Sequence, residues 1–295
     1  MPARRLAGVV ALTVTTLLAA TPSASAAPVP LPRPDHVLVV VIENKDPGEI
    51  IGNAAAPYLT GLARAGASFT DAHAETHPSQ PNYLALFSGS TQGVTDNGCD
   101  HRLTAPNLGS ALLASGRTFA GYSEGLPQAG STVCTAGRYA RKHSPWVNFT
   151  DLPGATTNLP ASTVGTAWDG LPTVAFLTPD LCHDMHDCPV SAGDAWAKAT
   201  LGSYLEWAGT HNSLLVLTFD ESETRTQGNP IATVLAGPMV TPGRYSDRID
   251  HYSLLRTIED MYGLSPLGAS ADRNPITDIW RTPLTTAPEA PASRR

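Results

Sequence analysis

Hydrophobic residues in this chain gather in short runs without polar interruption. Residues 36–42 read HVLVVVI and residues 213–219 read SLLVLTF. A continuous aliphatic run, in contrast to one that alternates with polar residues, is typical of a strand that is buried on both faces. Further runs at residues 118–122, 173–177 and 231–236 predict shorter strands.

Helical signals separate these strands. Residues 57–66 begin with proline and end with glycine, residues 108–115 predict a second helix, and residues 250–262 have one apolar face. Ser191, with Asp194 three residues later, is a variant of the capping box and predicts the start of a long helix. Strands that alternate with helices predict an α/β fold, a three-layer α/β/α sandwich with a mostly parallel central sheet.

The two ends of the chain differ from its middle. Residues 1–26 contain two arginines, an apolar run and a small-residue cleavage site, which is the pattern of a secretory signal. An uncleaved anchor is the alternative, but the apolar run is short for a membrane span. We therefore predict a secreted chain without an integral membrane anchor after cleavage. A proline-rich lead over 27–35, one domain over 36–281 and a disordered tail over 282–295 complete the predicted organisation.

Charge and cysteine content narrow the function. The 295 residues carry a formal net charge of −7 and no basic stripe, which argues against nucleic acid as a partner. An anionic substrate remains compatible, because a local metal ion outweighs the global charge. Four cysteines in an exported chain predict two disulfides, one between Cys182 and Cys188 and the other between Cys99 and Cys134. The spacings resemble no structural zinc site.

Acidic pairs follow the two strongest predicted strands. Glu43 and Asn44 come directly after residues 36–42, and Asp220 and Glu221 after residues 213–219. The carboxyl ends of parallel strands are where α/β proteins carry their chemistry. Such oxygen ligands suit a hard divalent cation, with calcium or magnesium favoured and manganese or zinc also compatible. The alternative is that these acids only cap loops or helices.

Ser79 stands just ahead of an apolar run that opens with Pro81. Proline at a first helical position predicts that Ser79 lies beside a helix N-terminus. The free N–H groups and the positive dipole of such an end suit a phosphate and a nucleophile that must lose its proton. The alternative is that Ser79 only caps the helix.

Histidines form a further set of candidates. Residues 178–188 hold two histidines and three aspartates directly after a predicted strand, and the predicted Cys182–Cys188 disulfide would make this segment rigid. A surface loop with incidental histidines is the alternative. His143 and His251 stand alone, and a lone histidine is often a packing or capping residue.

Motifs spread along the chain resemble the bacterial phosphoesterase family. In chain order they are Ile42-Glu43-Asn44, HPSQPNY at 77–83, GYSEGLP at 121–127, YARKHSPW at 139–146, DMHD at 184–187, FDE at 219–221 and HYSLLRTIE at 251–259. That family unites acid phosphatases and phospholipase C enzymes within the alkaline-phosphatase-like superfamily. The chain is most similar to small secreted actinobacterial acid phosphatases, some of which act on phosphatidylinositol 3-phosphate. The resemblance implies a secreted phosphomonoesterase whose partner is a phosphorylated small molecule or lipid headgroup.

The resemblance also assigns residues. Glu43 and Asn44 match the first metal-binding pair, and Asp220 and Glu221 match the second. Ser79 matches the nucleophile, which also contacts the metal and forms a phosphoserine intermediate.

Five further residues match the phosphate pocket. Asn82 stands where the superfamily places a side chain that holds a phosphoryl oxygen, and His143 and Asp184 fall in motifs that line the pocket. His186 or His251 would protonate the leaving group. The motif does not fix Asp180 and His183.

Other functions fit the sequence less well. A phospholipase C or another phosphodiesterase would share the metal and the nucleophile, but such enzymes are usually much longer. A sulfatase would need arginine where Tyr83 stands, and a Ser-His-Asp hydrolase would need a Gly-x-Ser-x-Gly turn around Ser79. A non-catalytic metal- or phosphate-binding protein would have no need for the serine together with the acids and histidines.

Overall fold

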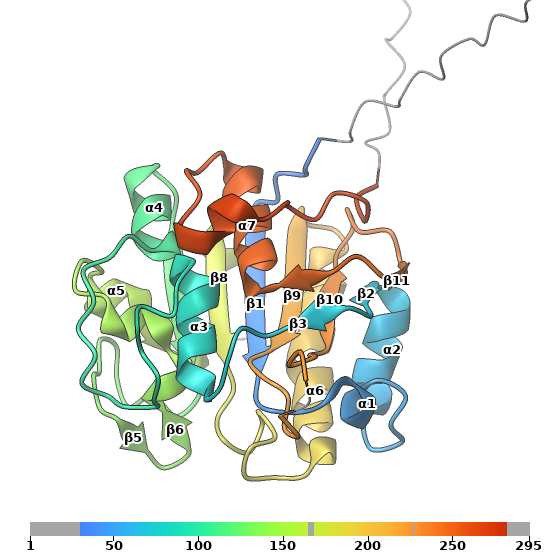
Figure 1. Cartoon of the computed structure of the whole chain (residues 1–295), viewed down its shortest axis with the longest axis horizontal. Helices are drawn as coiled ribbons and strands as arrows, with labels where there is room; N and C mark the ends of the chain where they lie inside the picture. The colour runs from blue at the N-terminus through green and yellow to red at the C-terminus, as the bar shows by residue number, and fades with distance from the viewer. Residues whose placement is uncertain (1–29, 165–167, 226, 282–295) are drawn as a thin grey trace, which may run out of the picture.

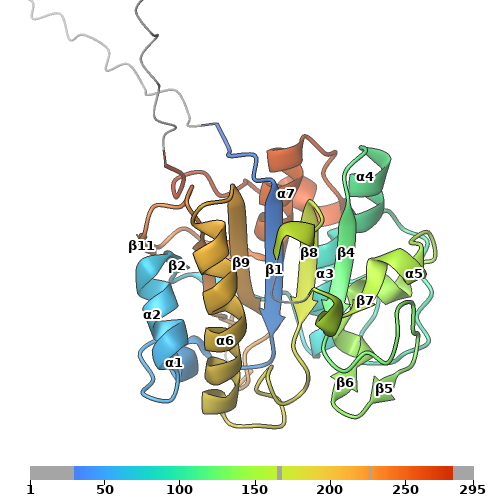
Figure 2. The same ribbon diagram turned by 180° about the vertical axis from the view of Figure 1, so that it is seen from behind.

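A computed structural model describes residues 30–164, 168–225 and 227–281 of the chain. The predicted signal sequence, residues 1–26, and the predicted tail, residues 282–295, lie outside the described residues. Figure 1 shows a central sheet with helices in front of it, and Figure 2 shows helices on the opposite face. The predicted α/β/α sandwich is therefore confirmed.

The central sheet has eight strands, of which seven run in the same direction. Their spatial order is β11 (Gly243–Tyr245), β2 (Ala67–Phe69), β10 (Thr233–Ala236), β9 (Ser213–Phe219), β1 (His36–Ile42), β8 (Val174–Thr178), β4 (Phe119–Ser123) and β7 (Asn158–Pro160). Only β10 is antiparallel to its neighbours. The expectation of a mostly parallel sheet is confirmed.

Strands β1 and β9 form the centre of the sheet. All seven residues of β1 pair with β9, from His36 opposite Ser213 to Ile42 opposite Phe219. Both strands are buried almost throughout, as their unbroken aliphatic runs predict. Because the two strands end level with each other, the chain leaves the sheet at Glu43 and at Asp220 side by side.

Two helix pairs cover the sheet. Helices α3 (Ser79–Ser88) and α7 (His251–Tyr262) pack together on one face, and α2 (Pro57–Ala65) and α6 (Val190–Ala208) pack together on the other (Figures 1 and 2). Shorter helices α1 (Pro47–Ile50), α4 (Leu108–Ala114) and α5 (Gly154–Thr157) lie around this frame, as do the strand pairs β3 (Ala72–His73) with β12 (Ile249–Asp250) and β5 (Thr135–Ala136) with β6 (Tyr139–Ala140).

The predicted capping box at Ser191 is wrong. Helix α6 begins at Val190, and Pro189 at its N-cap gives no side-chain hydrogen bond. Asp194 instead accepts hydrogen bonds from the backbone N–H groups of Tyr58, at 3.1 Å, and Leu59, at 2.8 Å. These residues lie in the first turn of α2, whose own N-cap is an alanine. Asp194 therefore caps a neighbouring helix that cannot cap itself.

Helix α3 begins two residues earlier than Pro81 predicts. Ser79 is its first residue, and Gly89 ends it in the left-handed conformation, with φ of 69°. Every residue of α3 is buried, which is typical of a helix enclosed by other elements on all sides. The position of Ser79 at the helix N-terminus is thereby fixed by the packing of the whole helix.

Both predicted disulfides are formed, Cys99 with Cys134 and Cys182 with Cys188. Disulfides of this kind are typical of proteins in oxidising, extracytoplasmic compartments. Among the helices of the described residues, none combines the length and the apolar character that crossing a bilayer requires.

Candidate active site

Hydrogen bonds from backbone N–H groups join the pair Glu43–Asn44 to the pair Asp220–Glu221 at the carboxyl ends of β1 and β9. The Asp220 carboxylate oxygen Oδ1 accepts hydrogen bonds from the backbone N–H of Asn44, at 2.8 Å, and of Glu221, at 2.7 Å. Asn44 adopts a left-handed backbone conformation, with φ of 45°, which turns the chain sharply after β1. Oxygen atoms of Glu43, Asp220 and Glu221 lie within 4.8 Å of one another. The structure therefore brings the two pairs into one buried cluster.

Ser79 reaches this cluster from the N-terminus of α3. Its hydroxyl donates to Glu43 Oε1 at 2.6 Å and lies 3.3 Å from Glu221 Oε1. The side chain is only 1% exposed. A hydroxyl, two strand-end carboxylates and a helix N-terminus thus converge from segments far apart in the sequence.

The buried oxygens of the cluster suit a divalent cation. Among the described residues, Asn44 Oδ1 and Asp220 Oδ2 have no hydrogen-bond partner although both are buried. Burial and the nearby Glu43 raise the pKa of Asp220 well above its usual value, because nothing in the protein compensates its charge fully. Carboxylate, amide and hydroxyl oxygens are the ligands that hard cations take, so this residue set fits such an ion.

His143 connects the cluster to Asp184. Its Nε2 forms an ion pair with Glu43 Oε2, and its Nδ1 lies 3.3 Å from Asp184 Oδ2. Burial would lower the pKa of His143, but the carboxylates of Glu43 and Asp184 raise it to about 9. The ring also stacks on Tyr83, with centroids 4.9 Å apart. His143 is therefore a buried cation that lies between the carboxyl groups of Glu43 and Asp184.

The two carboxyl groups beside His143 have pKa values that are shifted in opposite directions. Burial opposes ionisation of Glu43, yet His143 and Lys142 hold its pKa well below its usual range. For Asp184, burial outweighs the attraction of His143 and raises the pKa. Glu43 is thus the carboxylate that stays charged at the centre of the site.

Asn82 lies on α3, and its amide makes hydrogen bonds to the backbone of the preceding loop. Its Oδ1 accepts from the backbone N–H of Glu75 and Thr76, at 3.0 and 2.9 Å, and its Nδ2 donates to the carbonyls of Thr76 and Pro78, at 2.9 and 3.2 Å. Both amide hydrogens are in use. In this structure Asn82 therefore stabilises the loop that leads into Ser79.

The structure does not bring His186 and His251 into the cluster. The His186 side chain is 40% exposed and pairs with Asp187 at 2.7 Å. His251 is buried, its Nε2 lies 2.9 Å from the Phe219 carbonyl, and burial lowers its pKa. His251 thus packs beneath the strand end that carries Asp220.

Asp180 and His183 form a separate network with Glu124. His183 Nδ1 lies 2.8 Å from Glu124 Oε2, and the His183 ring stacks on Trp196. The backbone N–H of Asp180 donates to the same carboxylate at 3.0 Å. This network joins the Cys182–Cys188 loop to β4 and α6.

Sequence reasoning missed two basic side chains that contact the acids. Lys142 Nζ lies 3.0 Å from Glu43 Oε1, the oxygen that also accepts the Ser79 hydroxyl. His77 Nδ1 lies 2.5 Å from Glu221 Oε2. Both residues lie inside motifs that were recognised, one beside His143 and one two positions before Ser79, so their proximity in sequence is the signal that could have found them.

Comparison with solved structures defines the fold. A protein of the alkaline phosphatase superfamily from Vibrio parahaemolyticus superposes with a TM-score of 0.58, at 10% identity, over 84% of this chain and 72% of that chain. The chain therefore has the fold of the alkaline phosphatase superfamily.

The sequence comparisons define the family. The profile of the Phosphoesterase family matches residues 51–265, and the chain belongs to this family. A protein of Mycobacterium tuberculosis named phosphatidylinositol-3-phosphatase is 48% identical over 283 residues, which cover 94% of each chain. A probable acid phosphatase of Kluyveromyces lactis is 31% identical over 78% of this chain and 58% of that protein. The expected class of enzyme, a phosphoric ester hydrolase, is confirmed.

Proposed function

We propose that this chain is an exported, metal-dependent phosphomonoesterase of the acid phosphatase type that acts through a phosphoserine at Ser79. The observation that carries the proposal is the position of the Ser79 hydroxyl, 2.6 Å from Glu43 Oε1 at the N-terminus of a buried helix. The names of the relatives, phosphatidylinositol-3-phosphatase and acid phosphatase, support phosphate monoesters and phosphoinositides as substrates.

Glu43, Asn44, Asp220 and Glu221, together with the Ser79 hydroxyl, would hold a divalent cation. Calcium or magnesium suits these oxygen ligands best, and manganese or zinc is also compatible. A bound cation would lower the pKa of the serine hydroxyl and offset negative charge on the phosphoryl oxygens. The unpartnered Asn44 Oδ1 and Asp220 Oδ2 support this assignment.

Several residues of the chain have separate roles in this reaction. Glu43 accepts the Ser79 hydroxyl hydrogen bond and so orients Oγ toward phosphorus. As the Oγ–P bond forms, the Ser79 hydroxyl gives its proton to Glu43, the bond from phosphorus to the leaving oxygen breaks, and that oxygen takes up a proton. Water then attacks phosphorus, the Oγ–P bond breaks, Oγ takes up a proton again, and phosphate is released. The cationic side chains of Lys142, which is partly buried, and of His143, which is buried, compensate the charge of this centre.

The proton for the leaving group would come from His77. It pairs with Glu221 and its side chain is 22% exposed, so it is reachable for a leaving group at the edge of the cluster. His251 is enclosed in the core, and the exposed His186 hydrogen bonds to Asp187. His77 therefore replaces both as the proposed general acid.

We also propose that the protein is exported. The predicted signal over residues 1–26 would direct a single domain over 36–281 out of the cell, and the two disulfides support an oxidising destination.

One experiment separates this function from phosphodiester cleavage. Turnover of an aryl phosphate monoester is compared with turnover of its bis-aryl diester, before and after chelation, in the wild type and in Ser79→Ala. We expect preference for the monoester, loss of activity on chelation, and a loss of about 1,000-fold or more in Ser79→Ala. Preference for the diester would move the assignment to a phosphodiesterase, and near-wild-type turnover of Ser79→Ala would refute the phosphoserine.

A further inference from the structure

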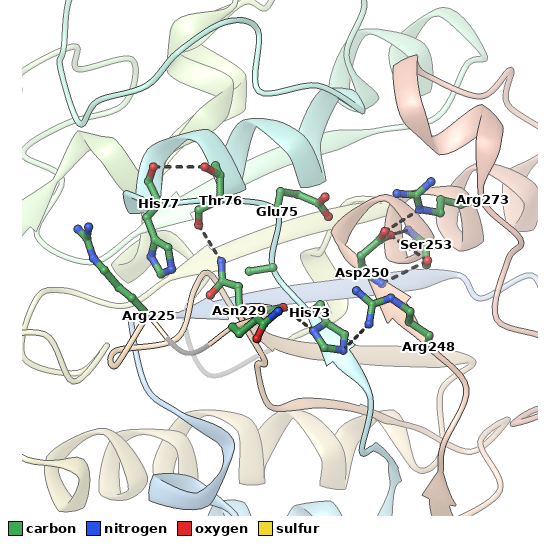
Figure 3. Close-up of a pocket in the computed structure, with 13 residues that line it drawn as sticks. His73, Glu75, Thr76, His77, Arg225, Asn229, Arg248, Asp250, Ser253 and Arg273 are labelled. Atoms are coloured by element: carbon green, nitrogen blue, oxygen red, sulfur yellow. Dashed lines mark hydrogen bonds and ion pairs between the residues drawn. The ribbon is translucent and has the colours of Figure 1, made fainter.

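A polar cavity of about 810 Å³, drawn in Figure 3, is lined in part by His77, which pairs with Glu221 of the Ser79 cluster. Cavities of this size accept whole small molecules, and this one is far larger than a phosphoryl group. Ser79 is not among the residues that line it. The space therefore suits the part of a substrate that leaves when its phosphate is transferred.

The same chain segments build the cavity and the cluster. Glu75, Thr76 and His77 line the cavity and lead directly into Ser79. Arg225 lies in the loop that follows the second acidic pair, and Arg248 precedes α7. His77 belongs to both sites, because it lines the cavity and pairs with Glu221, whose Oε1 is 3.3 Å from Ser79 Oγ.

The lining of the cavity contains more cationic than anionic side chains. Its lining includes Arg225, Arg248 and Arg273 against the two carboxyls of Glu75 and Asp250. This excess of positive charge contrasts with the formal net charge of −7 for the whole chain.

Both acids of the lining are already engaged. Asp250 accepts from Arg273 Nε at 2.6 Å and caps α7, and Glu75 accepts the backbone N–H of His251 at 3.2 Å. These contacts use the two carboxyls within the fold. The remaining guanidinium groups of the lining are therefore not neutralised by them.

Arg225 and Arg248 are the two accessible cations. Both are exposed, and the Arg225 guanidinium makes no ion pair or hydrogen bond with any other described residue. Arg248 Nη1 lies 3.0 Å from His73 Nε2 and 3.9 Å from Asp71. In Figure 3 Arg225 lies toward the His77 side of the cavity and Arg248 lies beside His73. The Arg225 guanidinium has no carboxylate partner among the described residues, and Arg248 has only the long contact with Asp71, so both can bind a phosphoryl anion.

We propose that this cavity is the leaving-group site, and that Arg225 and Arg248 select phosphate monoesters whose leaving group carries a second phosphoryl anion. The inference rests on the proposed phosphomonoesterase function and deepens it. A lipid headgroup with a phosphodiester and a free polyol bisphosphate share this chemistry.

The test compares four substrates by kcat/KM. An aryl phosphate has no second anion, inositol 3-phosphate is a polyol without one, and inositol 1,3-bisphosphate and dioctanoyl phosphatidylinositol 3-phosphate carry one. Each is assayed with the wild type, Arg225→Gln, Arg248→Gln and the double variant. Arg64→Gln is the matched control, because Arg64 is exposed on α2 and does not line the cavity.

We expect the wild type to prefer the two substrates that carry a second anion over inositol 3-phosphate. Each single variant should lower kcat/KM for them about tenfold, mainly through KM, and the aryl phosphate should change less than about twofold. Arg225→Lys should retain most of the preference, and Arg64→Gln should resemble the wild type. Preference for the lipid over the free bisphosphate would identify the headgroup as the source of the anion, and preference for the free bisphosphate would identify the soluble polyol phosphate.

Two results would overturn the inference while leaving the phosphomonoesterase intact. One is hydrolysis of the aryl phosphate without preference for a second anion. The other is an equal loss for all four substrates in the double variant, which would place the arginines at the transferred phosphate. Failure of the wild type to hydrolyse any of the monoesters would instead refute the proposed function itself.

Discussion

Replacement of His77 by asparagine separates proton donation from every other part of the proposed reaction. His77 Nδ1 lies 2.5 Å from Glu221 Oε2, so the variant also perturbs the acidic cluster. That perturbation affects all substrates alike, because each is attacked by the same Ser79. Loss of the proton donor affects only substrates whose leaving oxygen cannot depart as an anion. The ratio of the two losses therefore isolates proton donation.

The expected magnitude follows from the usual contribution of a general acid, which is about 100-fold or more, or about 2.7 kcal/mol of transition-state stabilisation. For an alkyl phosphate such as glycerol phosphate, kcat/KM should fall by this factor beyond any fall seen with nitrophenyl phosphate, whose leaving group needs no proton. The assay measures phosphate release from both substrates across the acid pH range.

His101→Asn is the matched control. His101 also pairs with a carboxylate, Asp96 at 2.9 Å, and its side chain is equally accessible at 22% exposure. We expect both substrates to be hydrolysed by this variant as by the wild type. Equal losses for the alkyl and the aryl phosphate in His77→Asn would refute the reasoning and return the proton donor to His251 or His186.

Three further predictions concern the metal, a helix cap and a buried acid. Asp220→Asn should abolish stabilisation by added divalent cation, measured as the shift of Tm with cation concentration, while the wild type gains about 2.7 kcal/mol at a hundred times its Kd. Asp194→Ala should lose about 2–3 kcal/mol of unfolding free energy, roughly 5–10 °C in Tm, because two N–H groups at the start of α2 lose their acceptor, and Asp194→Asn should lose less; equal stability of all three proteins would exclude the cap. Burial raises the pKa of Glu259 from 4.5 to about 7, so the folded state binds its proton more tightly and stability should fall by about 3 kcal/mol as the pH rises through this window. Urea titrations from pH 4 to pH 8 should show this slope flattened in Glu259→Gln, and an unchanged slope would contradict it.

The fold was predictable where the sequence pattern is periodic and local. The runs at His36–Ile42 and Ser213–Phe219 match β1 and β9 at both ends, because a strand buried on both faces tolerates no polar interruption. Glu43 and Asp220 come directly after these two strands. Their proximity at one end of the sheet was therefore predictable once the strands were predicted. The position of Ser79 followed in the same way from helix α3.

The contacts between distant segments were not predictable in this way. Asp194 has the sequence context of a cap for its own helix, and only the packing of α6 on α2 shows which N–H groups it meets. Likewise, the amide of Asn82 occupies the position of a phosphate ligand in sequence, but the backbone of the preceding loop takes all its hydrogen bonds. Side-chain direction in tertiary contacts carries no periodic signal in a single sequence.

The acidic cluster would couple the stability of this protein to cation binding and to pH. Glu43, Asp220 and Glu221 bring three carboxyls within 4.8 Å in a buried setting, and like charges at such distances cannot all ionise without compensation. Burial raises the pKa of Asp220 and of Glu221, so in the metal-free protein protons take up part of this charge. A divalent cation would displace those protons, and its affinity should therefore rise with pH. A protein that gains stability from the cation at neutral pH and little at low pH would show this competition directly, because the same oxygens that bind the cation hold the protons.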